Sequence, residues 1–335
     1  MEERASYSHQ QENPLDDLTM DNVCHTLVGA VLGDAGLKQR SRLASATLMI
    51  AANIPDIDVA VYATSIPPVS FRRGWTHGLL AQVLLPPVLA WLMWMWSRRR
   101  PADQPSRLGW LVALAYLGVF SHVGLDYLNN YGVRLLMPWS GRWFYGDTLF
   151  ILDPWMWTVL GVGVWLARRR RSVGPARTAV ALASVYVIAM LVSAQAARQF
   201  VLDAWTAAHG SAPVALMVGP SPVTPLTREV IVDAGDHYER GTFSWLPASV
   251  TFAEGVVPKN AQHPAVVEAR RAYPVQKFLV WSRFPLWTLA PDALGTSVTV
   301  SDARFGALRR LVGRSTFSAT VVVDAPNASD DPPSR

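Results

Sequence analysis

Cysteine is nearly missing from this sequence, since Cys24 is the only one among 335 residues. One thiol excludes an internal disulfide and any zinc module that depends on paired cysteines. Charged residues are also scarce, at 16% of the chain, whereas hydrophobic residues make up 50%. So few charges argue against a disordered chain, and this much hydrophobic content is unusual for a soluble domain.

Several familiar catalytic signatures are absent as well. The chain has no GxSxG nucleophile elbow, no Walker loop and no dinucleotide-binding fingerprint between a strand and a helix. Cys24 precedes His25, but adjacent residues on a helix point roughly 100° apart, which argues against a thiol–imidazole pair. Any chemistry therefore has to come from another set of side chains.

Both ends of the chain have the composition of tails. Residues 1–19 are polar and acidic without an apolar core, so we expect a flexible tail and no cleavable signal peptide, with Met20 as an alternative start. Residues 325–335, APNASDDPPSR, are typical of a disordered tail.

Long apolar runs dominate the N-terminal part of the chain. Runs close to the roughly 20 residues that a helix needs to cross a bilayer cover 76–96, 108–128, 151–167 and 178–197. Two shorter apolar segments precede them, one from about Asp21 to Leu37 and one from Leu43 to Pro55, which cannot continue the helical hydrogen-bond pattern. We expect an integral membrane protein, and the alternative is a set of buried helices in a soluble domain.

Clusters of basic residues beside these runs indicate how the chain crosses the membrane. The densest lie at 97–107 and 167–177, and KQRSR adds a third at 38–42. Loops rich in Lys and Arg stay in the cytoplasm, so the net charge of +5 does not indicate a nucleic-acid partner. The same rule predicts about six crossings, with the N-terminal tail and the chain from residue 198 onward outside the cytoplasm.

From about residue 198 the composition becomes that of a soluble module. Short runs rich in Val, Thr and aromatic residues, separated by Pro and Gly, are typical of strands. They are TREVIVDAG (227–235), RGTFSWLPASVTF (240–252), VQKFLVWSRFPLWTL (275–289), GTSVTVSDARF (295–305) and STFSATVVVD (315–324). We therefore expect an α-helical polytopic membrane domain over 20–197, followed by a small, β-rich extracytoplasmic domain over 198–324.

Six ionisable side chains from four segments reach the predicted outer face of the membrane. They are His25, Asp56, Asp58, His77, His122 and Asp126. Imidazole and carboxylate groups together suit zinc, with manganese or iron as substitutes. We therefore predict a metal site on this face.

His122 and Asp126 carry the clearest spacing in this set. Residues four apart lie on one face of a helix, so both side chains can bind the same ion. An HxxxD pair occurs by chance in many helices, but ionisable groups in an otherwise apolar span are expensive to bury and mark functional sites.

Each candidate also has a simpler interpretation. His25 can be a capping or interfacial residue, and His77 can anchor the chain at the membrane interface. Asp56 and Asp58 can be Asx-turn residues beside a proline. Four such coincidences on one membrane face are less plausible than a shared site.

Other polar residues are weaker candidates. Asp147 and Asp153 lie near the start of the apolar run 151–167 and can join the site or cap the helix, and capping is the favoured role. The loop 129–150 is rich in Trp, Tyr and Gly, which suits either interfacial anchoring or substrate contact. The histidines of the β-rich part lack ligand spacing and are interpreted as surface or core residues: His209, His237 and His263.

Five motifs together resemble a known family. They are MDNVCHTLVGAVLG (20–33), IPDID (54–58), RGWTHGLL (73–80), SHVGLDYLNNYGVRLLMPWS (121–140) and ILDPWMW (151–157). They look like the YdjM-type, LexA-binding, inner-membrane-associated family of predicted membrane-bound metal-dependent hydrolases. The order of the ligands is also distantly similar to zinc-dependent phospholipase C and P1-type nucleases. That similarity implies the metal ligands His25, Asp56, His77, His122 and Asp126.

The resemblance implies a hydrolase with one or two divalent ions, since the later HxxxE pair of the soluble enzymes is not found. A Zn²⁺ ion would be held by His77, His122 and Asp126, with a second near His25. Asp56 would act as ligand or general base, and Asp58 would orient a histidine. The expected substrate is a phosphoester or lipid-linked molecule at the outer face of the bacterial inner membrane. The alternative is a non-catalytic membrane scaffold or regulator with a structural metal or none.

Overall fold

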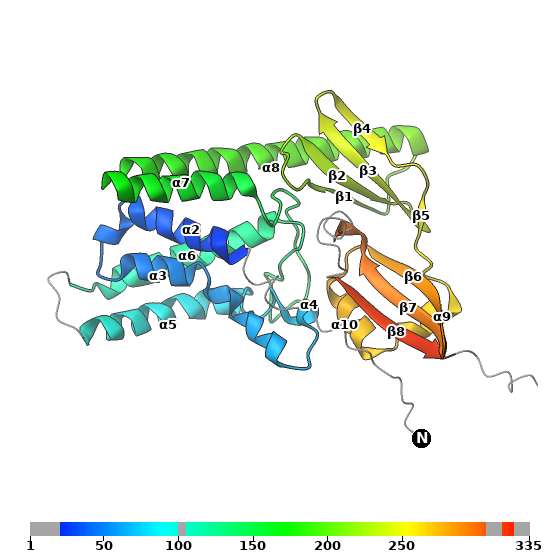
Figure 1. The fold of residues 1–335 in the computed structure, drawn as a ribbon, viewed down its shortest axis with the longest axis horizontal. Helices are drawn as coiled ribbons and strands as arrows, with labels where there is room; N and C mark the ends of the chain where they lie inside the picture. The colour runs from blue at the N-terminus through cyan, green and yellow to red at the C-terminus, as the bar shows by residue number, and fades with distance from the viewer. Residues whose placement is uncertain (1–20, 100–104, 306–316, 325–335) are drawn as a thin grey trace, which may run out of the picture.

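The computed structural model of the chain describes residues 21–99, 105–305 and 317–324. The predicted tails at 1–19 and 325–335 lie outside these residues. The helices of the N-terminal part form a bundle at one end of the molecule, and two β-sheets lie at the other (Figure 1). The helical elements of the bundle are α2 (Asp21–Asp34), η1 (Leu37–Gln39), α3 (Ala44–Ala51), η2 (Ile54–Ala63), α4 (Pro68–Phe71), α5 (Leu79–Arg98), α6 (Leu108–Leu128), α7 (Pro154–Arg170) and α8 (Gly174–His209).

The helices that are long and apolar enough to cross a membrane number three in the described part of the chain: α5, α6 and α8. The pair α3 and η2 passes the same test together, with a bend of 50° between its halves, and would make a fourth span. α2 has 14 residues and α7 has 17, which is short for a span. These candidate spans support a multi-pass membrane protein, while six crossings stay a prediction.

The basic clusters meet at one end of the bundle. Arg168 Nε donates to Asp34 Oδ2 at 2.9 Å, which joins the end of α7 to the end of α2. Arg42 Nη1 donates to the carbonyl oxygen of Ser97 at 3.0 Å, which joins the start of α3 to the end of α5. The loops that are rich in Lys and Arg are thus neighbours in space.

The first sheet packs on the far part of α8. It consists of β1 (Ala215–Pro220), β2 (Thr227–Asp233), β3 (His237–Trp245) and β4 (Ala248–Phe252), all antiparallel in that order, with β5 (Val257–Pro258) beside β3. Val201 and Trp205 of α8 are buried against Phe243 and its neighbours in the sheet. α8 has 36 residues and continues past residue 198, so the predicted domain boundary lies inside a helix.

The second sheet contains β6 (Pro285–Asp292), β7 (Gly295–Asp302) and β8 (Ser318–Asp324), again antiparallel, with η3 (Ala303–Phe305) following β7. Two helices, α9 (Pro264–Ala269) and α10 (Tyr273–Trp281), cover one face of it (Figure 1). The prediction of a strand over VQKFLVW is wrong, because Val275, Phe278 and Trp281 are three residues apart and bury one face of α10.

The aromatic loop 129–150 joins the bundle to the second sheet. Tyr131 belongs to the core beneath that sheet, and Trp143 Nε1 donates to the carbonyl oxygen of Val280 at 2.7 Å. Arg304, which is 1% exposed, donates to the carbonyl oxygen of Asn130 at 2.9 Å. The aromatic side chains of this loop therefore hold the sheet against the bundle.

Candidate metal centre

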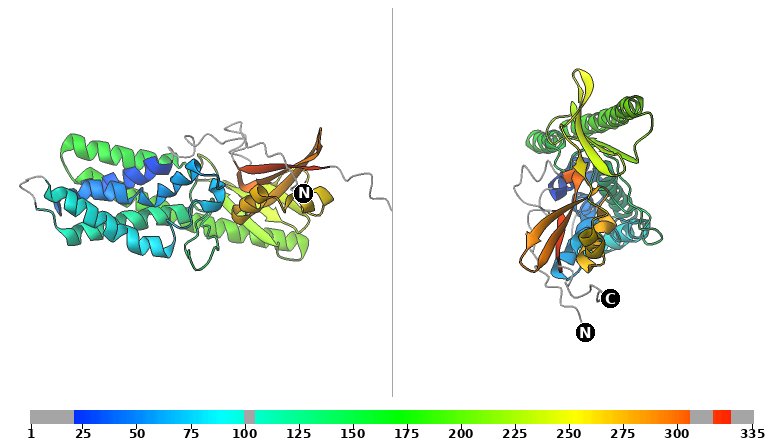
Figure 2. Two further views of the ribbon diagram at one scale, coloured as in Figure 1. Left: turned by 90° about the horizontal axis from the view of Figure 1, so that it is seen from below. Right: turned by 90° about the vertical axis from the view of Figure 1, so that its right-hand side faces the viewer.

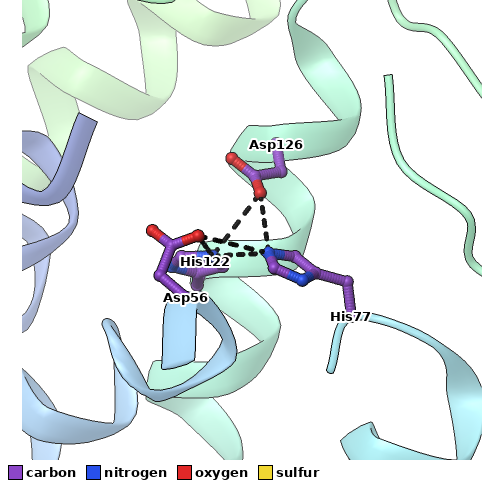
Figure 3. A group of neighbouring side chains, drawn as sticks. All are labelled: Asp56, His77, His122 and Asp126. Atoms are coloured by element: carbon purple, nitrogen blue, oxygen red, sulfur yellow. Dashed lines mark hydrogen bonds and ion pairs between the residues drawn. The ribbon is translucent and has the colours of Figure 1, made fainter. Parts of the chain in front are cut away.

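Three elements bring four ligand-type side chains together (Figure 3). These elements meet at the end of the bundle that faces the sheets (Figure 1). His122 and Asp126 lie one turn apart on α6, Asp56 is in the first turn of η2, and His77 lies in the turn before α5. One nitrogen or oxygen from each of these residues lies within 4.8 Å of all the others. These four side chains are at most 5% exposed.

Five of the six distances between the donor atoms of this group are close to those around a single tetrahedral ion. The two Nε2 atoms of His77 and His122 are 3.1 Å apart, and Asp126 Oδ2 lies 3.1 Å from the first and 3.4 Å from the second. Asp56 Oδ1 lies 3.6 and 3.8 Å from the same nitrogens. Ligand atoms about 2.0–2.1 Å from a tetrahedral zinc ion are separated by about 3.3 Å. The group thus has the size and the donor types of a metal site.

The tautomer of His122 is set by the break between α3 and η2. Asp56 N–H donates to the carbonyl oxygen of Asn53 rather than continuing the α-helical pattern. The carbonyl oxygen of Ala52 instead lies 2.7 Å from His122 Nδ1. A carbonyl can only accept, so Nδ1 carries the proton and a neutral His122 presents the lone pair of Nε2 to the group.

Asp58 and Thr76 orient His77 in the same way. Thr76 Oγ1 lies 3.2 Å from Asp58 Oδ2 and 3.0 Å from His77 Nδ1. The hydroxyl gives its one proton to the carboxylate, so it accepts from Nδ1–H and leaves the lone pair on His77 Nε2. Four electron-pair donors then face one another, which is the arrangement that binds a cation.

Asp58 contacts His77 on its Nδ1 side and does not face the four donor atoms of the group. Its Oδ2 lies 3.5 Å from His77 Nδ1 and accepts from Arg73 N–H at 2.7 Å. Asp56 belongs to the four-residue group and Asp58 does not. Their positions differ because Pro55 and the tight turns of η2 direct neighbouring carboxylates to opposite sides of His77.

His25 lies beside the group without being one of its four members. Its ring centroid is 3.9 Å from that of His122, and its Nε2 lies 3.5 Å from Asp126 Oδ1. It approaches the carboxylate oxygen opposite the one that faces His77. Of the six residues predicted from the sequence, four form the group and two, His25 and Asp58, contact it.

Two arginines complete the surroundings of the group and were missed in the sequence. Arg73 Nη2 lies 3.1 Å from Asp126 Oδ1, and Arg72 contacts Asp56 and Asp58 at 3.4 Å each. Burial alone would lower the pKa of Arg72, but Asp58 and Asp56 raise it above its ordinary value. Their position in the sequence could have identified them, since both directly precede the GWTH sequence that contains His77.

Arg73 also connects the group to the C-terminal part. Its Nη1 donates to Asn129 Oδ1 at 3.0 Å, and its guanidinium group lies 4.7 Å from the centroid of Tyr131. The carbonyl oxygen of Tyr131 accepts from Trp281 Nε1 at 3.2 Å. Buried contacts thus run from Asp126 to the core beneath the second sheet.

The remaining candidates have other roles. Asp153 caps α7 by accepting from the backbone N–H groups of Trp155 and Met156, as favoured from the sequence. Asp147 instead pairs with Arg283 at 2.9 Å, across to the C-terminal part. The three candidate histidines after residue 198 lie outside the group: His209 stacks on Trp205, His237 pairs with Asp236, and His263 caps α9.

The bundle and its buried site define an integral membrane protein with a candidate metal centre at one end of its helices. Residues 20–197, more than half of the chain, match the model of the YdjM inner membrane protein family, so the chain belongs to that family. No curated protein and no solved structure matches the chain in the corresponding comparisons.

Proposed function

We propose that this protein is a metal-dependent hydrolase that acts on a phosphoester or lipid-linked substrate at the outer face of the inner membrane. The observation that carries the proposal is the group of four buried donor atoms from Asp56, His77, His122 and Asp126. Buried ionisable groups in a membrane bundle are costly and mark functional sites. Zinc is the favoured ion because the donors are two imidazoles and two carboxylates.

The residues of the chain divide into those that hold the ion and those that orient them. His77 and His122 would bind through Nε2, with Asp126 and Asp56 as carboxylate ligands. A bound divalent ion would supply Lewis acidity and lower the pKa of a coordinated water toward about 7. Asp58 keeps His77 in the correct tautomer through Thr76, and Arg73 holds the second oxygen of Asp126.

Arg72 and Asp56 lie on the side from which a substrate would enter. Their side chains are 12% and 5% exposed, whereas those of His77 and Asp58 are fully buried. Asp56 would either hold the ion or, as the more exposed carboxylate of the group, accept a proton from an attacking water, and Arg72 is the cation placed to orient an anionic group.

The distribution of charge supports an outer-face location. The basic ends of α5 and α7 lie at the opposite end of the bundle from His77, which precedes α5. Clusters of arginine remain in the cytoplasm, so the site and the β-rich part would be extracytoplasmic. Substrate would then reach the site from the membrane interface, which favours a lipid or a lipid-linked molecule.

One observation favours a second candidate, a non-catalytic scaffold with a structural metal. Structural zinc sites have four protein ligands, whereas catalytic sites have three and keep one position open. The four side chains here are all buried. Removal of the ion would separate the two functions, since a catalytic ion is lost with little unfolding and a structural ion is lost with the fold.

Metal analysis of the detergent-purified protein tests the proposal. We expect the wild type to retain a divalent ion that His122→Ala loses, while His209→Ala, a histidine outside the group, keeps it. Circular dichroism would check that both variants remain helical. Phosphodiester, phosphomonoester and carboxylic-ester lipids would then be assayed in mixed micelles with and without chelator. A metal-free wild type, or a metal-loaded protein without hydrolytic activity on this panel, would overturn the proposal.

A further inference from the structure

Two loops of the first sheet are attached to the helices by tryptophan side chains. Trp245, at the end of β3, donates from Nε1 to Ser193 Oγ of α8 at 2.8 Å. Trp155, in the first turn of α7, donates from Nε1 to the carbonyl oxygen of Val223 at 2.8 Å. The loops at 221–226 and 245–248 are thereby fixed beside the bundle, and Trp245 N–H joins them by donating to the carbonyl oxygen of Leu226.

The point of attachment corresponds to the edge of a bilayer. α8 begins at Gly174, within the basic cluster at 167–177, and Ser193 is its twentieth residue. At about 1.5 Å per residue, twenty helical residues span roughly 30 Å, the thickness of the hydrocarbon core. Trp155 lies at the start of α7, and tryptophan is enriched at the membrane–water interface. Both loops therefore meet the helices at the predicted membrane surface.

The tips of these loops are apolar and unusually exposed. Leu246 is 75% exposed and Val223 is 68% exposed, and neither SPVTPL (221–226) nor WLPA (245–248) contains a charged residue. The hairpin of β3 and β4 extends beyond the outline of the helices in the view along the bundle (Figure 2, right). Its tip consequently lies over the area that lipid would occupy around the bundle, and not over the helices.

A row of exposed apolar side chains on α8 reaches the level of these loops. Val185, Ile188 and Val192 are 63%, 59% and 65% exposed, at the three- and four-residue spacing of one helix face. Val192 directly precedes Ser193, to which the β3–β4 hairpin is attached. The exposed apolar side chains of α8 therefore extend up to the level at which the hairpin is attached, and in a membrane-spanning helix they face lipid.

We propose that the tips at Val223 and Leu246 insert into the membrane interface, so that the first sheet rests on the bilayer. The partner is the lipid surface itself, and the tryptophan contacts hold the tips at the correct depth. The inference depends on the membrane character of the chain and not on the proposed hydrolase function. It also explains why the first sheet packs on a helix that extends past its membrane-spanning part.

Site-specific fluorescence in lipid nanodiscs tests this proposal. Cys24, which is buried, is replaced by alanine, and single cysteines are introduced by Val223→Cys and Leu246→Cys for labelling with a polarity-sensitive dye. Leu294→Cys is the matched control, because Leu294 is 64% exposed in the β6–β7 turn at the far end of the second sheet from the helices (Figure 1).

We expect dye at positions 223 and 246 to emit at shorter wavelength than dye at 294 and to be quenched by phosphatidylcholine that carries a shallow spin label. The two loops provide independent positions should one variant fail to fold, as checked by gel filtration. Equal emission and equal quenching at all three positions would overturn the proposal. Shorter-wavelength emission without lipid quenching, together with disulfide cross-linking between two chains of the unlabelled Leu246→Cys variant, would also overturn it and indicate a contact between copies.

Discussion

The carbonyl oxygen of Ala52 and the Nδ1 atom of His122 lie 2.7 Å apart, and this contact joins the break between α3 and η2 to a candidate ligand on α6. It requires α3 and α6 to approach closely one turn earlier, where α6 has Gly118. A Cβ atom at Gly118 would lie 2.5 Å from the Cβ of Ala51 and 3.0 Å from the nitrogen of Ala52. The geometry of the candidate metal centre therefore depends on the absence of a side chain.

Replacing Gly118 tests this dependence. We expect Gly118→Ala to separate α3 from α6, to weaken the contact of Ala52 with His122 and to destabilise the protein by about 1–3 kcal/mol. Metal content and thermal stability in detergent measure the effect. Gly124→Ala on the same helix is the control, since a Cβ there meets nothing within 4 Å. Equal behaviour of the two variants would contradict the prediction.

Asp58→Asn should reduce metal affinity without removing a direct ligand. The amide keeps the size of the side chain but loses the negative charge that accepts from Thr76 and Arg73 N–H. Loss of such an outer partner costs roughly 10–100-fold in metal affinity. Competition with a chromogenic chelator measures it, and Asp203→Asn, at an exposed position of α8, is the control. An unchanged affinity would show that Asp58 does not orient His77.

Removal of the Arg304 charge should destabilise the C-terminal part. Arg304 is 1% exposed and donates from Nε to Asp302 Oδ1 at 2.8 Å, so Arg304→Met leaves a buried carboxylate without its cation. Breaking a buried pair in this way costs about 3–5 kcal/mol. Denaturant unfolding followed by tryptophan fluorescence measures the change.

The exposed pair of Arg271 and Glu268 provides the comparison for this prediction. Arg271→Met should change the free energy of unfolding by no more than about 1 kcal/mol, because water screens an exposed pair. Similar losses in the two methionine variants would show that burial does not decide the contribution of the Arg304 charge.

The stability of the same region should fall in acid. Burial alone would raise the pKa of Asp302, but the Arg304 charge and hydrogen bonds hold it below its ordinary value of 3.8. A carboxyl group with a lowered folded-state pKa stabilises the fold above the unfolded-state pKa and loses this contribution as the pH falls through the folded-state pKa. Unfolding midpoints measured from neutral pH to below 3.8 should therefore decrease at the acid end. The decrease should be smaller for Asp302→Asn, and an identical decrease would contradict the assignment.

Much of the candidate metal centre was predictable because local rules apply to its residues. His122 and Asp126 share a helix face through their spacing, and the four-residue group contains both. Pro55 cannot continue the hydrogen-bond pattern of α3, and Asp56 follows it in the first turn of η2. Apolar runs of membrane length require that the ionisable residues between them collect at their ends.

Other parts were not predictable because they depend on contacts between distant segments. Nothing local to the aromatic loop 129–150 distinguishes interfacial anchoring from substrate contact, and the structure shows a third role, packing against the second sheet. The β-branched and aromatic residues of VQKFLVW favour a strand, whereas the helical form of this segment follows from the sheet that it covers.

The sequence by itself determined that this chain is a membrane protein and which side chains are ligand candidates, because hydrophobic length and ligand chemistry are properties of the residues alone. Only the tertiary structure decided that Asp56 joins the group while Asp58 supports His77, that Arg72 contacts both carboxylates, and that Arg73 contacts Asp58 and Asp126. Nothing in the sequence distinguishes two aspartates that lie two residues apart in a tight turn. They become different only when a packed neighbour fixes the direction of each side chain.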